Sequence, residues 1–272
     1  MGSPGFAGVA WAFFRRGALE ALSYRAASLL YAAGMALSML SFYFLSRFVG
    51  VGRHPALDNY GGDYLAFGLV GVVGLDFLHT AVGACARRVR ESQVTGTFEP
   101  MLATPTPETW VILCLPLYEY ASALGRACLW LGTGALLFGA RFRPDAPGAL
   151  VALVLSALAF GSLGLLSAAA TMWLRRTDPI SALFGALSLV FSGVFYPISV
   201  LPAWAAPVSA LLPTTHALEA MRAALLLGAG PADLFGPLSR LALFTILAGP
   251  VALLAFSAAL RRARIDGSLG QY

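Results

Sequence analysis

Apolar runs separated by short polar connections make up most of the chain after residue 25. A helix needs about 20 apolar residues to cross the hydrocarbon core of a bilayer. Six runs reach that length, and the connections between them are too short to hold a soluble domain. The pattern therefore predicts an all-α membrane protein, with residues 1–272 forming a single transmembrane domain. The predicted spans are residues 26–48, 64–86, 110–140, 148–174, 180–200 and 238–260.

The run at 110–140 differs from the others because it is longer than one crossing requires. Pro116, Glu119 and Arg126 interrupt it. Proline breaks the interior of a helix, and charged side chains are costly in hydrocarbon. Hydropathy alone consequently does not fix where this span begins.

The N-terminal segment at 6–22 is too mixed in character to be a span. Phe6, Val9 and Phe13 suggest an apolar side, and Arg15 and Arg16 a basic side. Such a pattern is typical of an amphipathic helix that lies in the membrane interface. The alternative is an irregular start to the first span.

Residues 202–230 are apolar but contain helix-breaking prolines, so we predict a re-entrant helical hairpin before the last span. After Pro213, the polar residues His216, Glu219 and Arg222 recur every three positions and share one side of a short helix. That side either lines an outer gate or faces water. One histidine and one glutamate are too few ligands for a zinc site, so no metal is expected.

Composition agrees with a membrane protein. The chain is 58% hydrophobic and 11% charged, with a mean hydropathy of +0.77, whereas soluble domains carry about a quarter charged residues. These values exclude secreted disulfide scaffolds, disordered proteins and ordinary cytosolic enzymes.

The net charge of +5 is the excess of 18 basic residues, all of them arginines, over 13 acidic residues. With six spans, the positive-inside rule predicts that both termini are cytoplasmic. Since orientation explains the arginines, nucleic-acid binding is not expected. The cytoplasmic side receives Arg15, Arg16, Arg25, Arg87, Arg88, Arg90, Arg175, Arg176, Arg261, Arg262 and Arg264, and the other side Arg47, Arg53, Arg141, Arg143, Arg222 and Arg240.

The absence of lysine also limits the chemistry of the chain. Without a Walker lysine, the chain has no P-loop of its own, and a Schiff-base lysine is excluded. The motifs HExxH and GxSxG are absent as well, so an intramembrane enzyme is not expected.

The connection at 87–108 is the most informative loop. Gly96 permits a sharp turn, Thr97 is suited to cap a short helix, and Glu99 would lie in its first turn. This short helix either docks in a groove of a cytoplasmic partner or lies against lipid. Its apolar stripe consists of Phe98, Met101 and Leu102.

Three segments of the sequence resemble the permeases of type-2 ABC exporters. The first is Glu91 followed by Gly96-Thr97-Phe98-Glu99-Pro100-Met101-Leu102-Ala103-Thr104-Pro105. The second is 193–204, which contains Phe195, Tyr196 and Pro197, and the third is 212–222. Their order along six spans also agrees with that family.

The resemblance implies how the chain works. The loop after the second span would be a coupling helix that contacts an ATPase subunit through Glu91 and the segment Gly96–Leu102. Asp178 is a weaker contact candidate, and capping of the start of the fifth span is its favoured role. The segments 193–204 and 212–222 would close the extracellular side. The function would be ATP-driven export of a hydrophobic or amphipathic substrate such as a drug or lipid.

The resemblance also implies the assembly. Two separate ATPase subunits would bind ATP and magnesium, so the chain itself would need no cofactor. A second permease chain, identical or different, would complete a dimer in the bacterial cytoplasmic (inner) membrane, surrounded by lipid.

Four ionisable residues fall within predicted spans: Asp76, His79, Glu119 and Arg126. They either face the translocation path or fix helix packing through an ion pair, for which Glu119 and Arg126 are the expected partners. A competing function is a proton-coupled secondary transporter with Asp76, His79 and Glu119 as the relay. The sequence lacks the paired interrupted helices typical of such transporters.

Overall fold

The computed structural model describes residues 5–23, 25–49, 55–174 and 178–265. Within these ranges the chain is helical and contains no strand, which confirms the predicted all-α class. Arg53, Arg175 and Arg176 lie outside the described residues.

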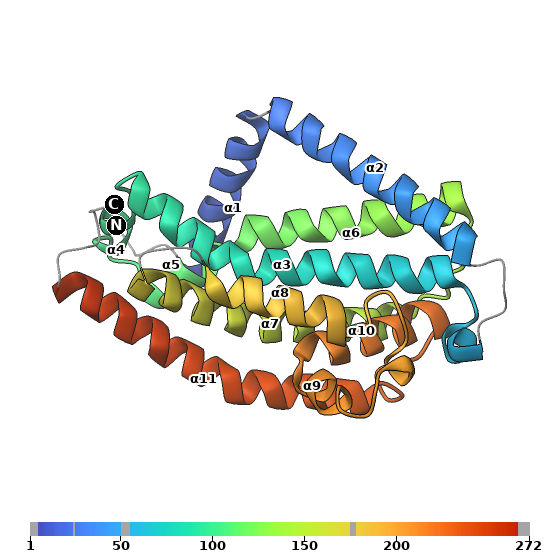
Figure 1. Ribbon diagram of the computed structural model, residues 1–272. Coiled ribbons are helices and arrows are strands. Elements are labelled where there is room, and N and C mark those ends of the chain that lie inside the picture. Colours follow the sequence, from blue (N-terminus) through green and yellow to red (C-terminus); the bar gives the residue numbers. More distant parts are fainter. Residues whose placement is uncertain (1–4, 24, 50–54, 175–177, 266–272) are drawn as a thin grey trace.

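Long helices lie side by side and form the body of the molecule (Figure 1). Among the described residues, four helical stretches are long and apolar enough to cross a membrane. Helices α3 and α7 lie at the centre, because α7 packs against α3, α11, α8 (Pro179–Phe191) and α10 (Pro213–Arg222). The four stretches are α3 (Tyr64–Val94), α5 with α6 (Glu108–Phe138), α7 (Ala146–Leu174) and α11 (Phe235–Ile265).

Shorter or more peripheral helices complete the fold. Helix α2 crosses obliquely over the body from the end of α1, and α9 and α10 lie at the opposite end of the bundle from α4 (Figure 1). We call these two ends the α4 end and the α10 end. The remaining helices are α1 (Phe6–Ser23), α2 (Arg25–Val49), α4 (Phe98–Leu102), α5 (Glu108–Cys114), α6 (Leu117–Phe138), α8 (Pro179–Phe191), α9 (Ala206–Leu211) and α10 (Pro213–Arg222), with the short turns η1 (Pro55–Tyr60), η2 (Ile198–Val200) and η3 (Ala223–Leu227).

Helix α3 is longer than the predicted second span. The expected loop at 87–108 begins only after Val94, because the arginines from residue 87 end the apolar run without ending the helix. The helix ends at Thr95, and Gly96 follows with a φ of +66°, a conformation that glycine adopts without steric cost.

The predicted span at 110–140 is divided into α5 and α6. The break falls at Leu115 and Pro116. Proline offers no N–H, and its ring clashes with the carbonyl of the residue four positions earlier, which is Ile112. Helix α6 ends at Phe138, before Gly139, whose φ of +72° is typical of a helix C-terminus.

The predicted span at 180–200 is helical only up to Phe191. Ser192 follows as the C-cap, and Gly193 has a φ of +71°. The chain then turns back through Pro197 and the short η2. The apolar run continues past this point, and for that reason hydropathy did not reveal the end of the helix.

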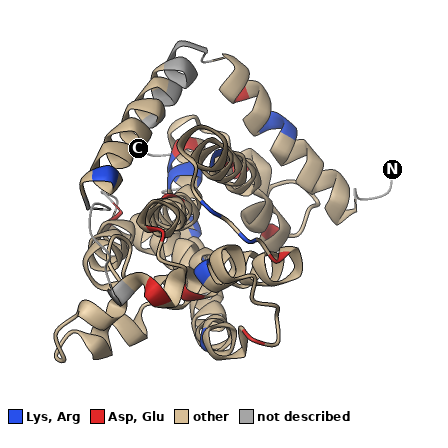
Figure 2. Cartoon of the chain, turned by 90° about the vertical axis from the view of Figure 1, so that its right-hand side faces the viewer, with Lys and Arg blue, Asp and Glu red and all other residues tan. Residues whose placement is uncertain are grey.

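Charged residues are sparse along the helices, as Figure 2 shows in a view down the bundle from its α10 end. Two of the four apolar clusters in the core of the described residues lie towards the ends of the bundle. The α4-end cluster includes Val89, Phe98 and Phe256, and the α10-end cluster includes Phe42 and Phe67. Between these ends α3 and α7 approach closely, since a Cβ on Gly164 would lie 2.7 Å from the Ala81 carbonyl oxygen.

Candidate functional site

The apolar stripe of α4 points into the protein. Phe98 is fully buried in the α4-end cluster, together with Val89 of α3 and Phe256 of α11, and Met101 and Leu102 pack against the same cluster. The prediction that Phe98 docks on a partner is therefore wrong, whereas Met101 and Leu102 keep part of their surface exposed. A short helix with one apolar face gains more by covering the core of its own chain.

The opposite side of the α3–α4 turn is open to solvent. Glu91, Gly96, Glu99 and Pro100 are exposed, and so is the apolar side chain of Val94. These residues form what we call the α4 surface. Any partner of this segment would contact the α4 surface instead of the stripe.

Thr97 lies at the N-cap position of α4 but makes no side-chain capping bond. Its backbone N–H donates to the Ser92 carbonyl oxygen at 2.9 Å, and its hydroxyl lies 3.0 Å from that of Thr95. These contacts close the turn around Gly96 and hold α4 against the end of α3.

Arg88 contacts carboxylates from three helices. Its guanidinium lies 2.6 Å from Glu20 of α1, 3.0 Å from Glu91 of α3 and 2.8 Å from Glu119 of α6. The predicted pair between Glu119 and Arg126 is therefore wrong. Helix α3 continues past residue 86, and this extension places Arg88 beside Glu119.

A second arginine, Arg16, strengthens the link between α1 and the ion pairs around Arg88. Arg16 donates to Glu20 at 2.9 Å and to the Met101 sulfur of α4 at 3.6 Å. Burial raises the pKa of Glu20, but hydrogen bonds from Arg16 and Arg88 outweigh it and hold this pKa below its ordinary value. The ion-pair network thus links α1, α3 and α6, with a contact to α4.

Arg126 pairs with Asp76 of α3 at 3.0 Å. It also donates to Thr80 at 2.7 Å and to Ser122 at 3.2 Å. These contacts join α6 to α3 at mid-height of the bundle. They support the interpretation that Asp76 and Arg126 fix helix packing.

His79 lies on another side of α3. It packs against Gly185 of α8, where a Cβ on the glycine would lie 2.2 Å from the ring. Asp76 and Glu119 are engaged by different arginines. Within the described part of the chain, the three residues of the supposed proton relay therefore have separate partners.

Arg222 is buried at the α10 end, with 2% of its surface exposed. Its guanidinium donates to the carbonyl oxygens of Gly193 and Val194 at 2.8 Å and of Phe67 at 3.3 Å. It also lies 3.5 Å from the centre of the Phe67 ring. The residue satisfies backbone acceptors just beyond the end of α8, which explains how α8 can stop inside the protein.

His216 is buried as well. Its Nε2 lies 2.9 Å from the Ala210 carbonyl oxygen, and its Nδ1 lies 3.5 Å from the half-buried Glu219. The interpretation that His216, Glu219 and Arg222 merely face water is therefore wrong. Their threefold spacing reflects contacts inside the α10 end.

The segment after α8 folds back on its neighbours. Tyr64 donates to the Phe195 carbonyl oxygen at 3.2 Å, Tyr196 donates to the Val190 carbonyl oxygen, and Pro197 is buried. This places the three predicted gate residues in one compact turn against α3 and α8.

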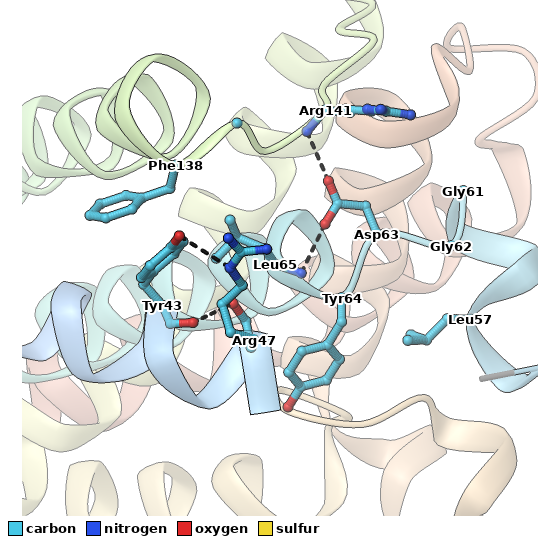
Figure 3. Close-up of a pocket in the computed structure, with 12 residues that line it drawn as sticks. Tyr43, Arg47, Leu57, Gly61, Gly62, Asp63, Tyr64, Leu65, Phe138 and Arg141 are labelled. Atoms are coloured by element: carbon cyan, nitrogen blue, oxygen red, sulfur yellow. Dashed lines mark hydrogen bonds between the residues drawn. The ribbon is translucent and has the colours of Figure 1, made fainter. Parts of the chain in front are cut away.

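A polar pocket of about 430 Å³ lies beside this end (Figure 3). Asp63 accepts hydrogen bonds from the backbone N–H groups of Leu65, Ala66 and Arg141 at 2.9–3.2 Å. Arg47 in turn donates to the Tyr43 hydroxyl at 3.2 Å. Asp63 therefore caps α3 and ties the α6–α7 loop to it, a role that the sequence analysis missed although an aspartate before an apolar run signals an N-cap.

Asp178 also caps a helix. Its carboxylate accepts a hydrogen bond from the Ser181 N–H at 3.0 Å at the start of α8.

The sequence analysis missed the partnership of Glu20 with Arg88. The only local sign of a role for Glu20 was its position four residues after Arg16, with which it forms an ion pair. In the part of the chain that the structure describes, no group of three or more His, Cys, Asp or Glu residues is placed to hold a metal.

Comparison with known proteins assigns the chain to a family. Residues 9–226 match the family of ABC-2 type transporters, and a search of curated proteins gave no match. Members of the family are transmembrane subunits whose ATPase activity lies in a separate ABC partner. The long apolar helices agree with a multi-pass membrane protein. The chain accordingly belongs to the ABC-2 type transporter family and is the transmembrane subunit of an ABC transporter.

Proposed function

We propose that the chain is the membrane subunit of an ATP-driven exporter and that its ATPase partner docks on the α4 surface. The observation that carries this proposal is the two-sided character of α4. Phe98 anchors the helix in the α4-end cluster, while Glu99 and Pro100 remain exposed. A segment that is firmly anchored on one side and open on the other is suited to pass a displacement into the bundle.

The contacts of the segment define where such a displacement would go. The α4-end cluster contains residues of α3, α7 and α11, so a movement of Phe98 acts on three long helices. Arg88 lies nearly two turns before the end of α3 and extends the connection to α1 and α6. Asp178, which caps α8, is a secondary contact candidate.

The complete assembly that we propose has two permease chains, identical or different, and two ATPase subunits that bind ATP and magnesium. Six spans, with α2 and α8 as the first and fifth, would place both termini in the cytoplasm of a bacterial cell whose inner membrane holds the complex. Exposed apolar side chains on these two helices, such as Leu37, Phe44 and Leu183, support contacts with lipid or a second permease chain. The cargo would be hydrophobic or amphipathic and would leave through the α10 end.

The test compares two exposed acidic residues at opposite ends of the bundle. Glu99→Arg reverses a charge on the α4 surface, and Asp58→Arg does the same in η1 at the α10 end. Co-purification with a co-expressed ABC ATPase and stimulation of its ATP hydrolysis are measured for both. We expect a loss of at least fivefold for Glu99→Arg and less than twofold for Asp58→Arg.

Two further variants separate binding from transmission. Glu91→Ala should weaken co-purification, whereas Phe98→Ala should reduce ATPase stimulation more than co-purification, because it loosens the anchor. If Glu91→Ala, Phe98→Ala and Glu99→Arg all leave both quantities unchanged, the α4 surface is not the docking site.

A further inference from the structure

An apolar cavity of about 360 Å³ lies between α3, α6, α7 and α10. Aliphatic and aromatic side chains line it almost completely, among them Val73, Phe77, Leu131, Leu153 and Leu218. None of the residues assigned to ATPase docking lies in its wall. The cavity is therefore a separate feature of the fold.

Water is a poor occupant for this cavity. A buried water needs two to four polar partners, and the hydroxyl groups in the wall are already engaged. Ser156 donates to the Ala152 carbonyl oxygen at 2.6 Å, and Thr214 shares a hydrogen bond with Ser188 at 2.8 Å. Since protein interiors contain few voids larger than a water molecule, a hydrocarbon occupant is the one that the wall favours.

The rim of the cavity faces the part of the surface that meets lipid. Leu150 of α7 lines the cavity and is exposed, and Leu129 and Val154, which follow the lining residues Cys128 and Leu153 in the chain, are exposed as well. In a multi-pass membrane protein, acyl chains cover such a rim. A hydrocarbon chain can consequently enter the cavity from the bilayer.

The backbone of Arg143 lies next to one end of the cavity. Ala146 and Leu225 line that end, and the backbone N–H of Arg143 donates to the Leu225 carbonyl oxygen at 2.8 Å. Arg143 is exposed, and so is the nearby Arg141. The neighbouring Asp145 carboxylate is engaged by the Gly148 N–H at 2.7 Å. An exposed guanidinium is well suited to bind a phosphate group.

We propose that the cavity binds one acyl chain of a glycerophospholipid whose phosphate contacts Arg143. The lipid would remain with the protein and fill the space between α6, α7 and α10. This inference does not depend on docking of an ATPase or on the direction of transport, so it can fail while the proposed function stands.

Cys128 offers a direct probe because it lines the cavity and is exposed, whereas Cys85 and Cys114 are buried. The full chain in a fixed concentration of detergent is titrated with dioleoylphosphatidylglycerol, and alkylation of Cys128 by N-ethylmaleimide is followed by intact-protein mass. We expect saturable slowing of at least fivefold. No slowing would overturn the proposal.

A matched pair of variants on α6 localises the effect. Ala127 lines the cavity, while Ala135 is exposed on the same helix outside it. In Ala127→Phe the lipid should change the labelling rate less than twofold, and in Ala135→Phe it should still slow labelling about fivefold. Equal slowing in both variants would place the lipid elsewhere.

The headgroup is tested with Arg143→Gln and with dioleoylglycerol, which lacks phosphate. Arg143→Gln should need at least threefold more phosphatidylglycerol for half-maximal protection of Cys128 from alkylation. The concentration of dioleoylglycerol that gives the same protection should not change. An unchanged phosphatidylglycerol titration would overturn the phosphate contact. Native mass spectrometry of the unmodified protein provides a check that needs no variant: one retained phospholipid per chain is expected, and none would contradict the proposal.

Discussion

Two arginines hold the opposite ends of the bundle in different ways. At the α4 end, Arg88 contacts the side chains of Glu20, Glu91 and Glu119, which come from three helices. At the α10 end, Arg222 donates hydrogen bonds to the backbone carbonyls of Phe67, Gly193 and Val194 and lies over the Phe67 ring. One arginine joins movable side chains, and the other joins fixed main chain.

This difference in the partners of Arg88 and Arg222 indicates which end of the bundle can rearrange. Carboxylate side chains can change rotamer or exchange partners while each helix stays intact, so the contacts of Arg88 can adjust during a conformational change. The carbonyls beyond α8 have no such freedom, because losing Arg222 would leave buried acceptors without a partner. We expect the α10 end to be the more rigid half and the α4 end to be the adjustable one.

The largest effect is expected from Arg222→Met. Removing the guanidinium leaves the buried carbonyls of Gly193 and Val194 without their donor, at a cost of about 3 kcal/mol or more in the free energy of unfolding. Thermal unfolding of the purified protein in detergent measures this loss. Arg240→Met is the control, since Arg240 is exposed at the same end, and it should change stability little. Similar midpoints for the two variants would refute the role given to Arg222.

A close approach at the same end gives the second prediction. A Cβ on Gly71 would lie 2.1 Å from the Val194 carbonyl oxygen and 2.8 Å from the Arg222 guanidinium. Gly71→Ala should therefore destabilise the protein by about 2 kcal/mol, within the range for overpacked sites. On α6, Gly125 has open space around it, and Gly125→Ala should be neutral or slightly stabilising. If denaturant titrations show equal stability for Gly71→Ala and Gly125→Ala, the α10 end has room for a methyl group at Gly71.

Arg88→Gln should have a smaller effect on stability, about 1 kcal/mol, because the carboxylates that it leaves are partly exposed to water. Its effect on ATPase stimulation in the assembled complex should be larger, at least threefold. If Arg88→Gln stimulates ATP hydrolysis normally but loses as much stability as Arg222→Met, the α4 end is the rigid end and not the adjustable one.

The smallest effect concerns pH. Because the pKa of Glu20 is held below its ordinary value of 4.5, its contacts contribute fully above that pH and are lost as the pH falls through the lowered pKa. Limited proteolysis of the α1 region should therefore accelerate slightly below about pH 4.5. Glu20→Gln should remove this pH dependence, and a persistent dependence would point to another group.

Hydropathy located the long helices but not their ends or their partners. It placed the second span at 64–86, whereas α3 continues to Val94, since an apolar run ends at the membrane boundary and a helix need not. For α8 the reverse holds, because the apolar run continues after the helix has stopped at Phe191.

Charge pairing depends on helix rotation, which sequence spacing alone does not give. Glu119 and Arg126 lie two turns apart on α6, but each finds its partner on α3, as Arg88 and Asp76. In the α4 segment, too, sequence spacing did not give the direction in which side chains point. Its turn at Gly96 followed from glycine chemistry, while the inward direction of Phe98 depends on α5, α7 and α11, which come later in the chain.

The short length of α8 has a consequence for the surrounding bilayer. Thirteen residues make a helix of about 20 Å, against a hydrocarbon thickness of about 30 Å. In the six-span arrangement that we propose, this hydrophobic mismatch would favour local thinning of the membrane beside α8, while the 31-residue α11 would demand no thinning. The protein would thus sit between unequal lipid environments, and we expect its thermal stability to be greater in bilayers of shorter acyl chains than in thicker ones.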